Sequence, residues 1–275
     1  MVRFGVAVLP NQPWPDLVET WRALDALRGV ESVWVADQLA NPYRREQPWF
    51  EAWSCLASLA RETERVRIGP LVSPLTLHNP ARLAKAAVTI DHASNGRLEL
   101  AVGAGGSAFD HALAQVERWP PADRARRFEA FVARLLELLA RDDLQPRPAQ
   151  ARIPLTVGGN GRSVLRVAAR HADRWNTYVG WQLPREEGRR LTRERNAELD
   201  RLCREAGRDP RTLVRSALIG HSFVAETPFA SQHAFREFCL AYEDAGIDEL
   251  IVYWPPEFAM PEDAFEPGLF ERLFS

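Results

Sequence analysis

Three glycines stand within four positions at one junction of the chain. The apolar run Ile153–Val157 stops at Gly158, Gly159, Asn160 and Gly161, and an amphipathic helical pattern begins directly afterwards. Glycine leaves backbone N–H groups open to a ligand, and the N-terminus of a helix attracts negative charge. The spacing therefore predicts an anion site at this junction, with a phosphate group as the natural occupant.

A second glycine-rich junction comes earlier in the chain. The run 97–105 ends in Gly103, Ala104 and Gly105, and Gly106 and Ser107 follow. This pattern lacks the spacing of the G-x-G-x-x-G dinucleotide motif and the Gly-Lys-Ser/Thr of a P-loop. A single junction of this kind also suits tight packing, but two of them favour a ligand that the backbone approaches closely.

Reactive side chains follow other apolar runs. Asp37 ends the run 32–37, where its carboxylate is placed to accept a hydrogen bond or a proton; the alternative is a turn cap or an arginine partner. Val72 and Ser73 end the next run, where small side chains suit a flat ligand or an ordinary turn before a proline. His78 and His111 follow the third and fourth runs, and we expect either of them to act as a proton donor.

Several function classes are disfavoured by the sequence. A net charge of −2 and a pI near 6.3 argue against nucleic-acid and membrane surfaces. No apolar run approaches the roughly 18 residues that span a bilayer, and the N-terminus does not resemble a signal peptide. The three cysteines lie far apart, and the histidines lack metal-ligand spacing. We therefore expect a cytoplasmic protein without a metal, and a metal-dependent hydrolase is disfavoured.

The order of elements indicates the fold. Eight apolar runs, each followed by a helical pattern, predict an α/β protein with a parallel sheet that is buried on both faces. Eight such units in 275 residues favour a single (β/α)8 TIM barrel over residues 1–275, with a doubly wound open sheet as the alternative. The catalytic end of such a barrel is the C-terminal end of its strands. The runs are 3–10, 32–37, 66–73, 97–105, 153–159, 174–180, 213–225 and 248–254.

Several phrases in the sequence resemble one family. "ESVWVADQL", "RIGPLVSPLTLHNPARLAKAAVTIDHASNGRLELAVGAGG", "PLTVGGNGRSVLRVAARHADRWN" and "AGIDELIVYWP" together resemble the bacterial luciferase-like family. Its members are flavin-dependent monooxygenases and coenzyme F420-dependent oxidoreductases built on a (β/α)8 barrel. The resemblance extends from residue 3 to about residue 256, and it is most specific in 66–106 and 153–176.

The resemblance implies a role for each matched position. Asp37 matches a position near the flavin ring, and the Val72–Ser73 link matches a non-proline cis peptide bond beneath it. The backbone beside the ring is matched by Gly103, Ala104 and Gly105. The cradle of the cofactor phosphate is matched by Gly158, Gly159, Asn160 and Gly161.

The chain also departs from the family pattern. Many F420-dependent members have a histidine directly after the strand-two aspartate, where this chain has Gln38, whose amide cannot act as an acid. Residues 106–107 lack the carboxylate that some sugar-oxidising members place there. The segment 141–152 is short, so we expect the mouth of the barrel to be open or to be covered by residues 105–123.

These observations favour an F420-dependent oxidoreductase that transfers a hydride to or from a small organic substrate. The first alternative is an FMN-dependent monooxygenase that uses reduced flavin and O2. A non-catalytic flavin-binding barrel is the second alternative. The resemblance further implies a homodimer, and a separate flavin or F420 reductase is a possible partner.

Overall fold

One parallel sheet forms the centre of the molecule. The computed structural model describes residues 2–42, 44–179, 185–219, 228–254 and 268–275. The strands follow the order β3-β2-β1-β9-β8-β7-β6-β5-β4, and all pairs are parallel. They are β1 (Arg3–Val8), β2 (Val30–Val35), β3 (Arg67–Pro70), β4 (Ser73–Pro74), β5 (Leu100–Gly103), β6 (Leu155–Gly158), β7 (Arg174–Val179), β8 (Val214–Ile219) and β9 (Glu249–Trp254).

The two ends of this strand order belong to a single barrel strand. β3 and β4 are separated only by Leu71 and Val72, and β3 pairs with β2 while β4 pairs with β5. A parallel bridge between Ile68 and Leu98 joins β3 to the residues before β5. The sheet is therefore closed at eight strand positions, which confirms the predicted (β/α)8 barrel over the open sheet.

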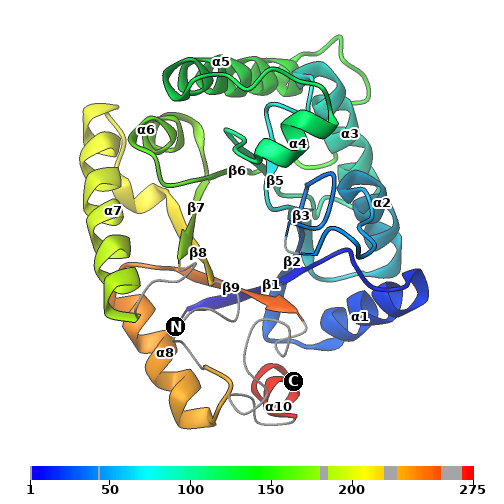
Figure 1. The fold of residues 1–275 in the computed structure, drawn as a ribbon, viewed down its shortest axis with the longest axis vertical. Helices are drawn as coiled ribbons and strands as arrows, with labels where there is room; N and C mark the ends of the chain where they lie inside the picture. Colours follow the sequence, from blue (N-terminus) through cyan, green and yellow to red (C-terminus); the bar gives the residue numbers. More distant parts are fainter. Residues whose placement is uncertain (1, 43, 180–184, 220–227, 255–267) are drawn as a thin grey trace.

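The helices surround this barrel, as Figure 1 shows. α4 differs from the others because it lies inside the outer ring of helices, beside β5. The sequence pattern did not predict α4. The helices are α1 (Trp14–Ala26), α2 (Ala52–Glu62), α3 (Pro80–Ala93), α4 (Ala108–Leu113), α5 (Pro121–Ala140), α6 (Arg162–His171), α7 (Arg185–Glu205), α8 (Gln232–Asp244) and α10 (Leu269–Phe274), with a short 3-10 turn at Pro210–Thr212.

Helix N-termini are fixed by local chemistry. The Asn79 side chain accepts hydrogen bonds from the N–H groups of Ala81 and Arg82, with Pro80 in the first turn of α3. The Glu51 carboxylate caps α2 in the same way. α6 begins after Gly161, which has no side chain to cap it, so the N–H groups of its first turn remain available to a ligand.

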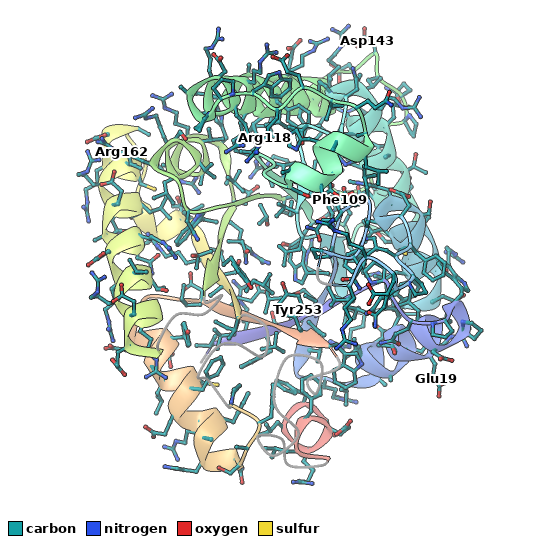
Figure 2. The ribbon with its side chains drawn as sticks, viewed as in Figure 1. Glu19, Phe109, Arg118, Asp143, Arg162 and Tyr253 are labelled. Carbon is teal, nitrogen blue, oxygen red and sulfur yellow. The ribbon has the colours of Figure 1, made fainter. Side chains whose placement is uncertain are left out.

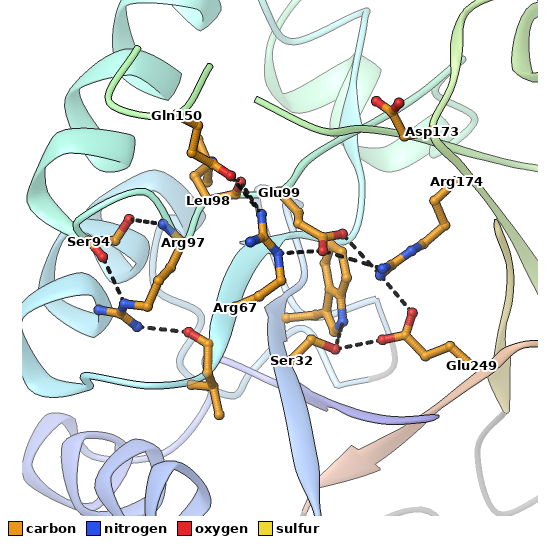
Figure 3. Close-up of polar contacts among 12 residues, drawn as sticks. Ser32, Arg67, Ser94, Arg97, Leu98, Glu99, Gln150, Asp173, Arg174 and Glu249 are labelled. Carbon is orange, nitrogen blue, oxygen red and sulfur yellow. Dashed lines mark hydrogen bonds and ion pairs between the residues drawn. The ribbon is translucent and has the colours of Figure 1, made fainter. Parts of the chain in front are cut away.

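A buried ionic cluster lies at the end of the barrel where the strands begin, which we call the lower end (Figure 3). Arg174 Nη1 lies 2.6 Å from Glu249 Oε2 and 3.0 Å from Glu99 Oε2. Arg67 donates to the second Glu99 oxygen at 2.6 Å, and the Ser32 hydroxyl donates to Glu249 at 2.9 Å. These residues lie at or near the N-terminal ends of the strands, which in such barrels maintain the fold rather than the chemistry.

Two further findings concern the chain as a whole. Within the described residues, no helix combines the length and the apolar character that crossing a membrane requires. Cys55, Cys203 and Cys239 are free thiols, and burial raises the pKa of the Cys55 and Cys239 thiols to about 12. All three therefore serve as small apolar side chains in the packing.

Candidate active site

A cavity of about 290 Å3 opens at the C-terminal ends of the strands. Its position is the catalytic end of a (β/α)8 barrel. In Figure 2, Phe109 on α4 and Tyr253 on β9 lie inside the ring of helices, whereas Arg162 lies on the outer side of the molecule, beside α6 and α7. The lining residues are Leu9, Ala36, Asp37, Gln38, Pro42, Leu71, Val72, Pro74, Thr76, Leu77, Gly105, Gly106, Ser107, Asp110, His111, Tyr178, Leu218 and Tyr253.

Asp37 is the centre of a hydrogen-bond cluster at this cavity. Its Oδ2 accepts from Ser73 Oγ at 2.5 Å, from His78 Nε2 at 2.8 Å and from Trp53 Nε1 at 3.1 Å. All three donors converge on one oxygen, so none of them uses the second carboxylate oxygen of this cavity-lining residue. Side chains from α2, from β4 and from the residues just before α3 therefore hold one carboxylate in a fixed position.

Each donor has its own local support. Trp53 lies in the first turn of α2, where its N–H group is one of the two that the Glu51 carboxylate caps, and its indole also donates to Ser73 at 3.1 Å. His78 lies just before Asn79, the capping residue of α3. The side chains that orient Asp37 are thus anchored to two helix starts, which limits their freedom.

α4 supplies the other titratable groups of the cavity. The Ser107 hydroxyl accepts from the Asp110 N–H at 3.1 Å and caps the helix. His111 Nδ1 lies 2.6 Å from the Ser107 carbonyl oxygen, which can only accept, so Nδ1 carries the proton. His111 Nε2 is buried without a hydrogen-bond partner, and this residue lines the cavity.

Asp110 is a buried carboxyl beside this histidine. Burial raises its pKa, and the negative charge of Asp37 acts in the same direction, while hydrogen bonds from Ser107 and the Leu39 backbone oppose the shift. The nearby Asp37 therefore adds to the cost of ionising Asp110.

The cis peptide bond was predicted one link too late. It joins Leu71 to Val72, not Val72 to Ser73. The reason is that the apolar run 66–73 is not one continuous strand: β3 ends at Pro70 and β4 begins at Ser73, so the irregular link falls in the break. Val72 nevertheless lines the cavity, as expected of a residue beside a flat ligand.

Val72 also explains two of the glycines. A Cβ at Gly103 would lie 2.5 Å from Val72 Cγ2, and one at Gly158 would lie 2.7 Å from Val72 Cγ1. Both distances are shorter than real Cβ contacts, so the Val72 side chain fills the space beside these backbones. At these two positions, what approaches the glycine closely is a side chain of the protein itself.

The other glycines of the 158–161 junction do not pack against Val72 as Gly158 does. Gly159 has a φ of +132°, a conformation that favours glycine. Asn160 bonds to β7, accepting from Thr177 Oγ1 at 2.7 Å and donating to the Tyr178 carbonyl at 3.1 Å. Nothing lies within 4 Å of a Cβ built on Gly161, so space remains open at the start of α6.

The cavity thus brings together only part of the predicted site. Asp37, Val72, Gly105 and His111 line it, and Ser73 and His78 reach it through Asp37. The predicted residues of two glycine-rich segments do not line the cavity. They are Gly103 and Ala104 in the first segment, and Gly158, Gly159, Asn160 and Gly161 in the second.

Sequence reasoning missed Asp110 and Trp53. The signal for Asp110 was present, because Ser107-x-x-Asp110 is a helix-capping pattern that places a carboxylate in the first turn. Trp53 gave no signal beyond its place in a helical pattern. Within the segment 105–123, the residues Gly105, Gly106, Ser107, Asp110 and His111 line the cavity. Among the described residues, no three His, Cys, Asp or Glu side chains form a metal-binding group.

A comparison with protein families identifies the chain. The family described as luciferase-like monooxygenase matches residues 1–266. This chain belongs to the luciferase-like family. The resemblance noted in the sequence is therefore confirmed over nearly the whole length.

Individual relatives of this luciferase-like protein differ in activity. An F420-dependent glucose-6-phosphate dehydrogenase of Amycolatopsis mediterranei (strain U-32) is 32% identical over 193 residues, which are 63% of this chain and 56% of that protein. A 4-hydroxyprotoasukamycin monooxygenase of Streptomyces nodosus subsp. asukaensis is 30% identical over 153 residues, 52% of this chain and 38% of that protein. This chain thus matches little more than half the length of the first of these relatives.

Solved structures agree with the luciferase-like fold. An F420-dependent secondary alcohol dehydrogenase, in complex with an F420-acetone adduct, matches with a TM-score of 0.80 and 19% identity. The match covers 98% of this chain and 97% of that one. At 19% identity this likeness concerns the fold alone.

Proposed function

We propose that this luciferase-like protein is an oxidoreductase that uses coenzyme F420 to transfer a hydride to or from a small organic substrate. One observation carries the proposal. Val72 lines the cavity and packs against Gly103 and Gly158, and Gly158 stands only four residues before the first residue of α6, whose start is open. A ring in the cavity and a phosphate at α6 can therefore belong to one molecule.

The residues present fit such a cofactor. The uncapped N–H groups at the start of α6 and the open space at Gly161 suit a phosphate. Ala36, Leu71 and Val72 offer an apolar wall to a flat ring. The bound deazaflavin would supply the hydride chemistry, and the protein would supply position, exclusion of water and proton transfer.

Proton transfer is assigned to the groups around the cavity. His78 Nε2 donates to Asp37 Oδ2 at 2.8 Å, which fixes the position of the imidazole beside the carboxylate. His111 lines the cavity, and its ring is fixed through Nδ1, which leaves the buried Nε2 without a hydrogen-bond partner. Replacing His78 or His111 separately with glutamine tests these roles, because an unchanged turnover would remove the residue concerned from proton transfer.

Cofactor binding is the decisive experiment. Fluorescence titration of the purified protein with F420 and, separately, with FMN is expected to show tighter binding of F420. A Gly161→Asp variant places a carboxylate at the start of α6, where a Cβ meets no other atom, and should weaken F420 binding at least tenfold. Gly161→Asn is the matched control, because it has the same size and capping ability without the charge.

The second candidate is an FMN-dependent monooxygenase, favoured by the monooxygenase from Streptomyces nodosus among the relatives. A preference for FMN in the same titration, followed by oxygen consumption with reduced FMN, would establish it instead. Tight cofactor binding without any substrate-dependent redox change would indicate the non-catalytic barrel. Failure to bind either cofactor would overturn the proposal itself.

The proposal extends to partners and location. It includes a separate F420 or flavin reductase that regenerates the cofactor, a homodimeric assembly and a cytoplasmic location. Sedimentation of the purified protein tests the assembly, because a mass of twice 31.1 kDa is expected.

A further inference from the structure

The charges that face the cavity are of one sign. Among the described lining residues, Asp37 and Asp110 are carboxylates, and there is no lysine or arginine. Most of the remaining lining is apolar, including Leu9, Leu71 and Leu218. A dianionic group such as a phosphate ester would enter a poorly solvated space beside negative charge, where repulsion is strong.

The two carboxylates differ in how they are compensated. Asp37 receives three side-chain hydrogen bonds, one of them from His78. Asp110 is only 4% exposed and forms no ion pair with arginine or lysine within the described residues. Burial raises its pKa, in keeping with a site that disfavours further negative charge.

Within the part of the chain that the structure describes, no lysine or arginine side chain lines the cavity. Arg45 lies over the Phe109 ring, with its guanidinium carbon 4.1 Å from the ring centroid, but it is exposed and does not line the cavity. The segments 180–184, 220–227 and 255–267 lie outside the described residues. By sequence they contain no lysine or arginine and five acidic residues.

The unpaired atom of His111 indicates what a substrate must bring. The side chain is 3% exposed, its Nδ1 donates to the Ser107 carbonyl, and its Nε2 has no partner. In the neutral imidazole this Nε2 is an acceptor. A buried acceptor without a partner is costly, so a ligand that donates a hydrogen bond there gains more than one that cannot.

We propose that the cavity takes an uncharged substrate with an apolar body and one hydrogen-bond donor, that His111 Nε2 accepts this donor, and that Asp110 excludes anionic substrates such as sugar phosphates. The inference rests on the proposed function in placing the substrate beside the cofactor. It separates this chain from the glucose-6-phosphate dehydrogenase activity named for the relative from Amycolatopsis mediterranei.

The role of Asp110 is tested by binding of two matched probes to the cofactor-loaded protein at pH 8. Calorimetric titration should show cyclohexanol binding at least tenfold more tightly than cyclohexyl phosphate. Asp110→Asn, which preserves the size of the side chain, should reduce this ratio at least threefold through tighter binding of the phosphate. Arg45→Ala is the control and should leave the ratio unchanged.

Three results would overturn the role of Asp110. The phosphate ester could bind to the unaltered protein as tightly as the alcohol, the ratio could stay the same in Asp110→Asn, or Arg45→Ala could abolish phosphate binding, which would make Arg45 a phosphate ligand. Absence of cyclohexanol binding up to its solubility limit would also overturn the proposal.

The role of His111 needs a second pair of probes. Methoxycyclohexane has nearly the shape of cyclohexanol but no donor, so the unaltered protein should prefer the alcohol by about tenfold. His111→Leu should remove this preference, and His111→Gln, whose amide oxygen still accepts, should retain part of it. An undiminished preference in His111→Leu contradicts the assignment.

The two proposals fail in different ways. If F420 does not bind, the proposed function is lost, yet the probe ratios are still measurable on the protein loaded with FMN or without cofactor. If F420 binds and the ratios do not respond to Asp110 and His111, only the substrate assignment is lost.

Discussion

Two polar clusters lie at opposite ends of the same barrel, and they are built differently. At the lower end, Arg174 lies between Glu99 and Glu249, and Arg67 neutralises the outer side of Glu99. At the upper end, where the strands finish, Asp37 and Asp110 line a cavity, and His111 Nε2 has no hydrogen-bond partner. In the lower cluster every charged side chain lies against one of opposite charge, whereas within the described residues Asp110 has no cationic partner and His111 Nε2 has no hydrogen-bond partner.

This difference separates stability from function along the strand direction. Substitution within a cluster of paired buried charges lowers the stability of the fold, because removal of one member leaves the others uncompensated. An incomplete cluster at a cavity carries a cost in the free protein that a ligand can relieve. The residues at the two ends should therefore respond to substitution in different measurements.

The largest expected effect is at the lower end. Arg174→Met should lower the free energy of unfolding by about 3–5 kcal/mol, because two buried carboxylates lose their shared cation. Denaturant unfolding followed by circular dichroism measures it. Arg162→Met is the matched control: its pair with Glu198 is on the surface, and a loss of about 0–1 kcal/mol is expected. Similar losses in both variants would contradict the distinction between the two ends.

The next largest expected effect is at Gly158, which packs against the cavity-lining Val72. Gly158→Ala should displace Val72 and lower the free energy of unfolding by about 1–3 kcal/mol, with weaker cofactor binding. Gly106→Ala is the control, because nothing lies within 4 Å of its Cβ although Gly106 lines the cavity. Unfolding and cofactor titration are measured on both variants. Equal behaviour of the two would show that Val72 yields without cost.

A smaller effect is expected from Trp53, which links the helix layer to the upper cluster. Trp53→Phe keeps most of the ring but removes the indole N–H that donates to Asp37 and Ser73. A loss of about 1.5–3 kcal/mol is the usual cost of a hydrogen bond to a charged group, and we expect the lower end of that range because two other donors remain. Thermal unfolding and the pH profile of turnover both report the change, and neither should move if the indole merely fills space.

The smallest effect concerns the pH dependence of stability. Because the Asp110 pKa is raised in the folded protein, the folded state binds this proton more tightly than the unfolded state. The contribution to stability is present below the ordinary pKa of 3.8 and is lost as pH rises through the folded value. The stability of the unaltered protein relative to Asp110→Asn should therefore fall as pH rises. A flat difference between pH 3 and pH 7 would contradict the raised pKa.

The barrel was predictable because its signals are local and repeated. Each strand is an apolar run such as Leu155–Val157, and each helix carries its own cap, as Asn79 does for α3. The third strand was predicted in place, but its break at Leu71 and Val72 was not, since nothing in an apolar run marks an interruption.

The site was predictable where a residue ends or follows an apolar run. Asp37, Val72 and His111 were found in this way, and all three line the cavity. The convergence of Trp53 and His78 on Asp37 depends on how α2 and the residues before α3 pack over the barrel, which a sequence read in order does not contain. Gly158 was expected to lie close to another group, and the structure shows that this group is the Val72 side chain. The absence of a side chain in the sequence does not say whether a ligand or a protein group takes the space.

The composition has a practical consequence at α3. Lys85 is the only lysine in a chain with 35 basic residues, and its ammonium group donates to the Gln145 carbonyl on the outside of the barrel, away from the cavity lining. Amine-reactive reagents thus have one side chain to modify. A dye or a surface tether attached there would leave the barrel mouth free, which suits single-molecule fluorescence and immobilised binding assays.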